Sequence, residues 1–270
     1  MNALNLIYIT NDPDIAKICV LSGVDRIMVD LEKEGKAERQ FGLDTLISNH
    51  SVSDIERIRA AAEEIELLVR INPLSDRTPF EVDEALSRGA DSIMLPMADD
   101  YATVCDFSNI VRGRAKKVLL LETIPAMIRA SEICQKDLVD EVHIGLNDMH
   151  IDSRLNFMFE LMASHVMDSL CALLQRRAIP FGIGGIAPIS QVNKLQANLI
   201  ITQHARLGSN QVIMSRGFNE ILCKADSMDV MKNEVKALKL AFDKSLKLST
   251  SEVDKKLFEF KNCISEILHS

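Results

Sequence analysis

Short apolar runs alternate with stretches of helical spacing along the first 217 residues of the chain. Each run has the length of a strand and is mostly apolar throughout, which is typical of a parallel strand that is covered on both faces. The stretches between the runs place apolar residues three or four positions apart, as amphipathic helices do. The predicted strands span residues 6–9, 26–30, 67–71, 92–95, 118–121, 142–144, 180–183 and 211–214.

This alternation predicts an α/β fold of the (β/α)8 TIM-barrel type, in which each strand is followed by a helix. The length of 270 residues suits such a barrel. A doubly wound open sheet is the alternative, but it fits less well because no glycine-rich phosphate loop follows the first run. The same spacing predicts a helix over 124–133 and one long amphipathic helix over 157–177.

The segment after the eighth strand is predicted to be helical in two or three pieces. It exceeds what the barrel requires, so we expect a barrel domain over residues 1–217 and a C-terminal helical extension over residues 218–270. One apolar stripe follows Val235, Leu238 and Phe242, and a second follows Phe260 and Ile264. Such stripes must be covered, either by the flank of the same barrel or by a neighbouring subunit.

Two of the predicted strands lead directly to a carboxylate. Glu122 comes after the run 118–121, and Asp148 ends the turn that follows 142–144. Because parallel strands all exit at the same edge, we expect the two carboxylates to lie close together at the face where barrels place their chemistry. Like charges at short distance are costly unless a cation or a shared proton relieves them. We interpret the pair as a site for a hard divalent cation such as Mg2+, with two solvated loop acids as the alternative.

Composition and charge narrow the class of protein. The net charge of −8 and the absence of a long basic run argue against binding to nucleic acid. No uncharged apolar stretch approaches the roughly 18 residues that a membrane span needs, and the N-terminus has no signal-peptide pattern. The six cysteines are scattered without CxxC spacing, which favours free thiols and a cytoplasmic location.

Five segments on successive predicted strands occur in an order and spacing that resemble a known family. They are Val-Asp-Leu-Glu at 29–32, Leu-Val-Arg-Ile-Asn-Pro at 68–73, Gly-Ala-Asp-Ser-Ile-Met-Leu-Pro at 89–96, Leu-Leu-Glu-Thr at 120–123 and Gly-Leu-Asn-Asp at 145–148. Together they are similar to the HpcH/HpaI aldolase and citrate lyase β-subunit family. The resemblance extends to Gly-Ile-Gly-Gly at 182–185, where the glycines either bind a phosphate or let the chain approach a neighbour closely.

The resemblance implies a barrel, often trimeric or hexameric, that makes or breaks carbon–carbon bonds through the enolate of pyruvate or of an acyl-CoA. It places Glu122 and Asp148 on the metal ligands of the family, with Mg2+ as the expected ion and Mn2+ or Co2+ as possible substitutes. It places Arg70 beside the enolate oxygen. The substrate carboxylate would be held by backbone N–H groups of the turn that contains Gly145, Asn147 and Asp148.

The chain departs from the family pattern after the second strand. Pyruvate aldolases of the family carry Asp-x-Glu-His there, whereas this chain has Asp30-Leu-Glu32-Lys33 and therefore lacks the histidine acid/base. We assign Asp30 and Glu32 to the catalytic part of the site. His150, two residues beyond Asp148, is our candidate replacement for the missing histidine, and the other is His50, at the end of the loop after the second strand.

Two basic residues in that loop, Lys36 and Arg39, are candidates for binding a phosphate, a CoA or a sugar-acid group, as in the citrate lyase branch. Solvated loop charges are the equally weighted alternative. Arg70 also has a structural alternative, an ion pair with Asp30 or Glu32 across the barrel mouth.

The sequence therefore predicts a cytoplasmic, Mg2+-dependent carbon–carbon lyase of the aldolase type that acts on a 2-oxo acid and forms a homo-oligomer. Two alternatives remain open. One is a lyase of citryl- or malyl-CoA thioesters, and the other is a non-catalytic barrel that serves as a subunit of a larger complex.

Overall fold

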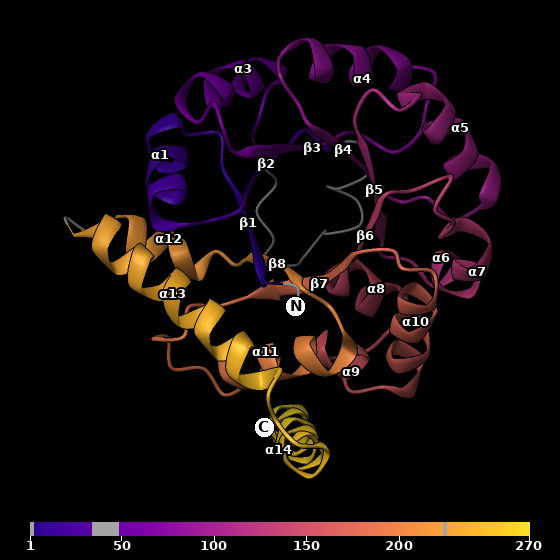
Figure 1. The fold of residues 1–270 in the computed structure, drawn as a ribbon. Coiled ribbons are helices and arrows are strands. Elements are labelled where there is room, and N and C mark those ends of the chain that lie inside the picture. Colours follow the sequence, from indigo (N-terminus) through magenta and orange to yellow (C-terminus); the bar gives the residue numbers. More distant parts are fainter. Residues whose placement is uncertain (1–2, 34–48, 224–225) are drawn as a thin grey trace.

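The structure is a computed structural model that describes residues 3–33, 49–223 and 226–270. Its strands form one closed parallel barrel, in which each strand pairs with its neighbours in the sequence and β8 pairs with β1 (Figure 1). The predicted (β/α)8 barrel is therefore confirmed, and the open sheet is excluded. The strands are β1 (Asn5–Ile9), β2 (Arg26–Asp30), β3 (Glu66–Arg70), β4 (Ser92–Leu95), β5 (Lys116–Leu121), β6 (Glu141–Ile144), β7 (Phe181–Ile186) and β8 (Gln211–Met214).

Helices surround the barrel on its outer side (Figure 1). Glycines end two of them, because Gly23 and Gly208 adopt the left-handed conformation with φ of 86° and 76°. The helices are α1 (Pro13–Ser22), α3 (Val52–Ala61), α4 (Thr78–Ser87), α5 (Tyr101–Val111), α6 (Ile124–Ile128), α7 (Ala130–Ile133), α8 (Leu146–Asp152), α9 (Phe159–Met162), α10 (His165–Arg176), α11 (Ala197–Leu207), α12 (Gly217–Leu222), α13 (Ser227–Ser245) and α14 (Thr250–Leu268).

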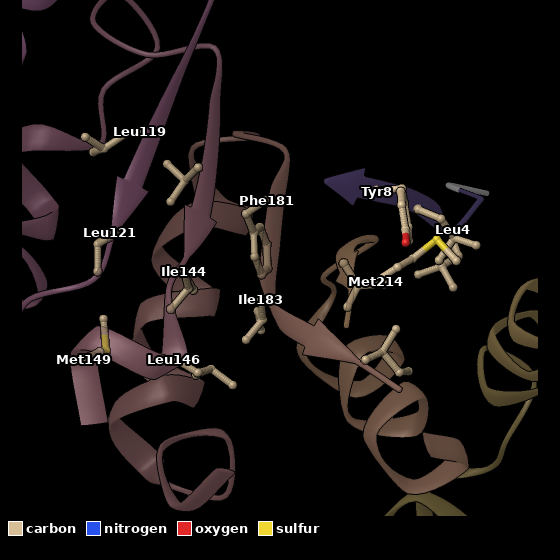
Figure 2. Close-up of a cluster of buried hydrophobic side chains, with 14 of the residues drawn as sticks. Leu4, Tyr8, Leu119, Leu121, Ile144, Leu146, Met149, Phe181, Ile183 and Met214 are labelled. Carbon is tan, nitrogen blue, oxygen red and sulfur yellow. The ribbon is translucent and has the colours of Figure 1, made fainter. Parts of the chain in front are cut away.

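Strand alternation divides the apolar residues into two layers. Outward-facing residues such as Leu119, Leu121 and Ile144 pack against the helices, and α8 adds Leu146 and Met149 to this layer (Figure 2). Inward-facing residues form a separate cluster inside the barrel, made of Ile7, Met28, Leu68, Met94, Val118 and Leu120. Since side chains alternate with a period of two, the residue two positions beyond an inner residue also faces the barrel interior.

The end of the barrel at which the strands begin is closed by a buried ion cluster. The guanidinium of Arg26 donates to both oxygens of Glu141, at 2.8 and 3.0 Å, and lies 2.6 Å from Glu66. Lys116 also pairs with Glu66, at 3.0 Å. The opposite, C-terminal end of the strands is left for the site.

Local structure near the site differs from the sequence prediction in three places. The helix predicted over 157–177 is divided into α9 and α10, because the Ser164 hydroxyl accepts the Met167 N–H and starts a new helix. The helix predicted over 124–133 is divided at Arg129 into α6 and α7. The turn predicted to end at Asp148 is instead the first turn of α8.

The C-terminal helices pack on the barrel of the same chain. Helix α13 contacts α1 and α11, and α14 contacts α11 and α9. Figure 1 shows α14 outside the ring of helices, beyond α9 and α11. The domain boundary at residue 217 stays a prediction. Within the described ranges, no helix combines the length and the apolar character that a membrane crossing requires.

Candidate active site

Strand alternation positions three charged side chains at the mouth of the barrel. Asp30, Arg70 and Glu122 come from the ends of β2, β3 and β5, and each lies two positions beyond a residue of the inner apolar cluster. They therefore face the same interior from three strands. The preceding inner residues are Met28, Leu68 and Leu120.

A cavity of about 890 Å³ opens at this end of the barrel. This volume lies within the range of about 300–1,000 Å³ that is common for small-molecule sites. The three charged residues line the cavity. Residues of β6 and of the start of α8 also line it, together with one loop histidine. These are His143, Gly145, Asn147, Asp148 and His50. The structure therefore brings the expected strand-end residues of β2, β3, β5 and β6 into one space.

Arg70 is held in place by two carboxylates. Its Nε and Nη2 donate to the two oxygens of Asp30, both at 2.8 Å, and its Nη1 lies 3.2 Å from Oε2 of Glu32. These carboxylates, together with Glu122, raise the pKa of Arg70 although burial opposes the charge. The predicted ion pair is thus present, and Arg70 also lines the cavity. Its contacts do not use all the N–H donors of a guanidinium, so donors remain for a substrate oxygen.

The surroundings of Glu122 disfavour the ionised form of its carboxyl group. The residue is buried, with 2% of its surface exposed, and its Oε1 accepts the Met97 N–H at 3.2 Å. Burial raises its pKa to about 8, and the charges of Asp148 and Glu32 act in the same direction, whereas Arg70 lowers it. The carboxylate of Glu122 would therefore be stabilised by an additional positive charge in the cavity.

The second acid, Asp148, lies in the first turn of α8 and is half-buried. A carboxylate in that position is favoured by the N-terminal end of the helix. Gly145 precedes the helix and lets the two acids face one cavity, because a Cβ there would lie 2.8 Å from the Glu122 Cβ and 3.2 Å from its Oε2. A side chain at position 145 would therefore displace Glu122.

These two acids fit the donor set that a hard divalent cation prefers. Glu122 and Asp148 line the same cavity and repel each other electrostatically. In the described part of the chain, no group of three or more histidine, cysteine or acidic side chains is placed to hold a metal ion. Mg2+ does not need such a cage, because it often takes one or two carboxylates and keeps water or substrate oxygens at its other positions.

The two candidate histidines have different surroundings. His50 is buried, lines the cavity, and accepts the Asp30 backbone N–H with its Nδ1 at 3.0 Å. His150 lies on α8, is half-buried, and is not among the described residues that line the cavity. The geometry therefore favours His50 as the residue that replaces the missing family histidine. The assignment of His150 to the same role stays a prediction.

His143 on β6 also lines the cavity, but both sides of its ring are constrained. Its Nε2 donates a hydrogen bond to the Gly184 carbonyl oxygen at 3.2 Å, and its Nδ1 lies against Gly182, where an added Cβ would be 2.5 Å from it. Burial is the main cause that lowers the pKa of His143 to about 4, so the ring is neutral. The glycines of 182–185 therefore permit a close approach and an irregular register between β7 and β8, which supports the second interpretation of that motif.

Two predicted site residues, Lys36 and Arg39, lie outside the described residues. The structure also adds lining residues that the sequence does not identify. Many of these are apolar residues contributed by the segment before and within α9, by the region before and within α11, and by α14. The polar ones are Asn193, Lys194, Ser215, Arg216 and Asn219. In the sequence, the apolar stripe through Phe260 and Ile264 indicates one of these lining residues, because the stripe continues to Ile267, which lines the cavity.

A family model described as HpcH/HpaI aldolase/citrate lyase matches residues 6–163, which is more than half of the 270 residues. The match includes β1 to β6 and all of the charged residues described above. No curated protein sequence matches the chain.

Solved structures with the same barrel include the HpcH/HpaI aldolase from Desulfitobacterium hafniense DCB-2, at 14% identity and a TM-score of 0.61, covering 92% of this chain and 95% of that one. A HpcH/HpaI aldolase/citrate lyase family protein from Burkholderia cenocepacia J2315 has 14% identity and a TM-score of 0.63, covering 88% and 94%. The citrate synthase SbnG has 13% identity and a TM-score of 0.60, covering 87% and 95%. At such identities the similarity shows the fold alone.

Proposed function

Because the chain belongs to the HpcH/HpaI aldolase/citrate lyase family, we propose that it is a divalent-metal-dependent carbon–carbon lyase of the aldolase type. Its substrate would be pyruvate or a related 2-oxo acid, which reacts through its enolate. The observation that carries the proposal is the position of Arg70, whose guanidinium is fixed by Asp30 and Glu32 in the cavity that Glu122 and Asp148 also line.

The reaction follows from the charge that it creates. When a methyl proton leaves pyruvate, negative charge develops on the oxygen of the 2-oxo group. The enolate carbon then attacks an aldehyde carbon, a carbon–carbon bond forms, and the former aldehyde oxygen takes up a proton to give a 4-hydroxy-2-oxo acid. Cleavage is the reverse. A divalent cation held by Glu122 and Asp148 would supply Lewis-acid stabilisation of oxygen charge.

Arg70 would stabilise the same developing charge from the protein side. It is permanently protonated, and Asp30 and Glu32 keep it in one orientation, so little reorganisation is needed when the charge appears. The substrate carboxylate would accept hydrogen bonds from backbone N–H groups at Asn147 and Asp148, since the first N–H groups of a helix have no partner within that helix. Gly145 keeps this region close to Glu122.

Exchange of the methyl protons of pyruvate in deuterated water tests the proposal directly. We expect the exchange to require added Mg2+ and to stop when the metal is chelated. NMR monitors the loss of the pyruvate methyl signal, with no aldehyde present. Release of pyruvate from oxaloacetate under the same conditions is a second readout, because decarboxylation leaves the same enolate. A protein that binds Mg2+ and pyruvate but catalyses neither reaction would contradict the proposal and favour a non-catalytic barrel.

We further expect His50 to supply a fixed hydrogen-bond donor in place of the missing family histidine. Because Nδ1 accepts the Asp30 N–H, the neutral ring must carry its proton on Nε2. His50→Asn keeps an acceptor near the Nδ1 position and removes the Nε2 group. We expect a loss of aldol turnover of about 10²–10³-fold, the range typical of removing one oxyanion donor, with an unchanged melting temperature. His150→Asn is the parallel variant, and a larger loss there would assign the role to His150.

A further inference from the structure

The cavity lining has a polar side and, from α9, α11 and α14 together with the segments before α9 and α11, a mostly apolar side that also includes Asn193 and Lys194. The polar side contains Arg70, Glu122 and Asp148, which the proposed chemistry uses. The other side takes no part in that chemistry. We define the apolar wall by its lining residues, which are Phe157, Met158, Phe159, Leu195, Ile200 and Ile267.

The apolar wall is assembled from distant parts of the sequence. Helix α14 joins it through Ile267, which lies at the end of the stripe whose earlier members Phe260 and Ile264 are buried in the core. Ile267 itself is half-buried, and it both packs against the core and lines the cavity.

Two contacts fix α14 in this position. Phe260 packs edge-on against Phe159, with ring centroids 6.4 Å apart and an interplanar angle of 89°. At the end of the chain, the Ser270 hydroxyl accepts a hydrogen bond from Nζ of Lys194 at 2.7 Å, and Lys194 itself lines the cavity. The C-terminal helix is therefore tied to the wall on both sides of Ile267.

The size and polarity of the cavity argue for a substrate larger than pyruvate. A three-carbon acid occupies only a small part of about 890 Å³, and its carboxylate and carbonyl belong to the polar side. Much of the remaining space is bordered by aliphatic and aromatic side chains, although Lys194 and Arg216 also line it. Burial of an apolar group against such aliphatic and aromatic side chains is favourable because it displaces water from them.

We propose that the apolar wall is the subsite for the aldehyde partner, that this partner carries an apolar chain, and that Ile267 of α14 limits the length of the chain. The proposal rests on the proposed aldolase function and adds the class of the second substrate. Transfer of one methylene from water is worth about 0.8 kcal/mol, and about 1.4 kcal/mol is a factor of ten. Each methylene that reaches the wall should therefore raise kcat/KM by about fourfold.

The experiment measures kcat/KM with pyruvate, Mg2+ and a series of straight-chain aldehydes from acetaldehyde to octanal. We expect a rise along the series up to a limiting length in the wild type. Ile267→Ala should move that limit to longer aldehydes, and Ile267→Asp should lower the ratio of kcat/KM for hexanal to kcat/KM for acetaldehyde at least about tenfold.

Phe258→Asp is the matched control, because Phe258 lies on the same helix with 66% of its surface exposed and is not part of the apolar wall. It should leave the chain-length dependence as in the wild type. Equal shifts in the Phe258 and Ile267 variants would overturn the proposal, since the effect would then come from the helix as a whole. Melting temperatures of all variants identify any loss of folding, and Ile267→Ala remains informative if Ile267→Asp fails to fold.

Pyruvate exchange without aldehyde separates this proposal from the proposed function. If exchange is absent in the wild type, the proposed function fails. If exchange is present but kcat/KM is flat along the aldehyde series, only the apolar subsite is overturned. A preference for 6-oxohexanoate over hexanal would also overturn it, because the basic residues Lys194 and Arg216 of the lining would then determine the substrate.

Discussion

Glu122→Gln should abolish Mg2+-dependent pyruvate exchange, by at least about 10³-fold, and remove measurable Mg2+ binding. The glutamine has the shape of the glutamate and still offers an oxygen to the Met97 N–H, which Glu122 accepts at 3.2 Å. What it loses is the negative charge that a hard cation needs. Asp148→Asn should likewise lower both the exchange rate and the affinity for Mg2+. Calorimetric titration with Mg2+ measures the affinity of each variant, and the exchange assay measures its rate.

Asp152→Asn is the matched control for these variants. Asp152 is on α8, four residues after Asp148, but it is exposed, and its Oδ2 accepts the Ile124 N–H outside the cavity lining. Loss of one carboxylate from α8 should therefore leave exchange and Mg2+ affinity unchanged. If the control loses as much as Asp148→Asn, the effect belongs to the charge of the helix, and the assignment of a metal ligand is wrong.

The pKa of Glu122 adds a pH dependence to the same experiment. Its value of about 8 in the metal-free protein means that the group is mostly protonated at pH 6. A metal ligand must be deprotonated, so binding releases a proton and the apparent Mg2+ affinity should fall as the pH drops below 8, by up to about tenfold per unit. Glu122→Gln has no such proton to release. An affinity that is constant between pH 6 and pH 8.5 would contradict the role of Glu122.

The order of the strands and the place of the acids are predictable from the sequence because both depend on local pattern. A buried parallel strand is apolar along its whole length, so the eight runs identify the barrel without any tertiary information. Glu122 and Arg70 follow because the two-residue period of a strand fixes the face to which its last residue points. The local pattern of each strand is therefore enough to predict that both side chains lie at the same end of the barrel.

Other features depend on contacts between distant residues and have no local signal. The division between α9 and α10 interrupts an amphipathic pattern that continues across residue 163, and it is decided by the Ser164 cap. A buried backbone N–H needs an acceptor, and the acceptor for the Asp30 N–H is supplied by His50, which is twenty positions away in the sequence. The stripe that ends at Ile267 is visible in the sequence, but its place in the cavity depends on the packing of Phe260 against Phe159.

Arg70→Met and Arg26→Met should be equally destabilising but differ completely in their effect on exchange. The two arginines are inside the same barrel, and each binds two carboxylates at opposite ends of it. Arg26 binds Glu141 and Glu66, while Arg70 binds Asp30 and Glu32. Both side chains are largely buried, with 8% and 13% of the side-chain surface exposed. Removal of either leaves buried carboxylates without their counter-charge, which costs about 3–5 kcal/mol of unfolding free energy.

The exchange assay then separates a structural arginine from one that also meets the substrate. Arg70→Met should lower the exchange rate per folded molecule by about 10²–10³-fold, because the developing enolate charge loses its fixed donor. Arg26→Met should keep that rate, since Arg26 lies at the closed end of the barrel behind the inner apolar cluster. Urea titration gives the folded fraction of each variant, and Arg70→Lys, which keeps the charge but cannot form the fork, should fall between wild type and Arg70→Met. Normal exchange in Arg70→Met would show that its ion pair with Asp30 is its only role, because the loss of stability alone cannot distinguish the two arginines.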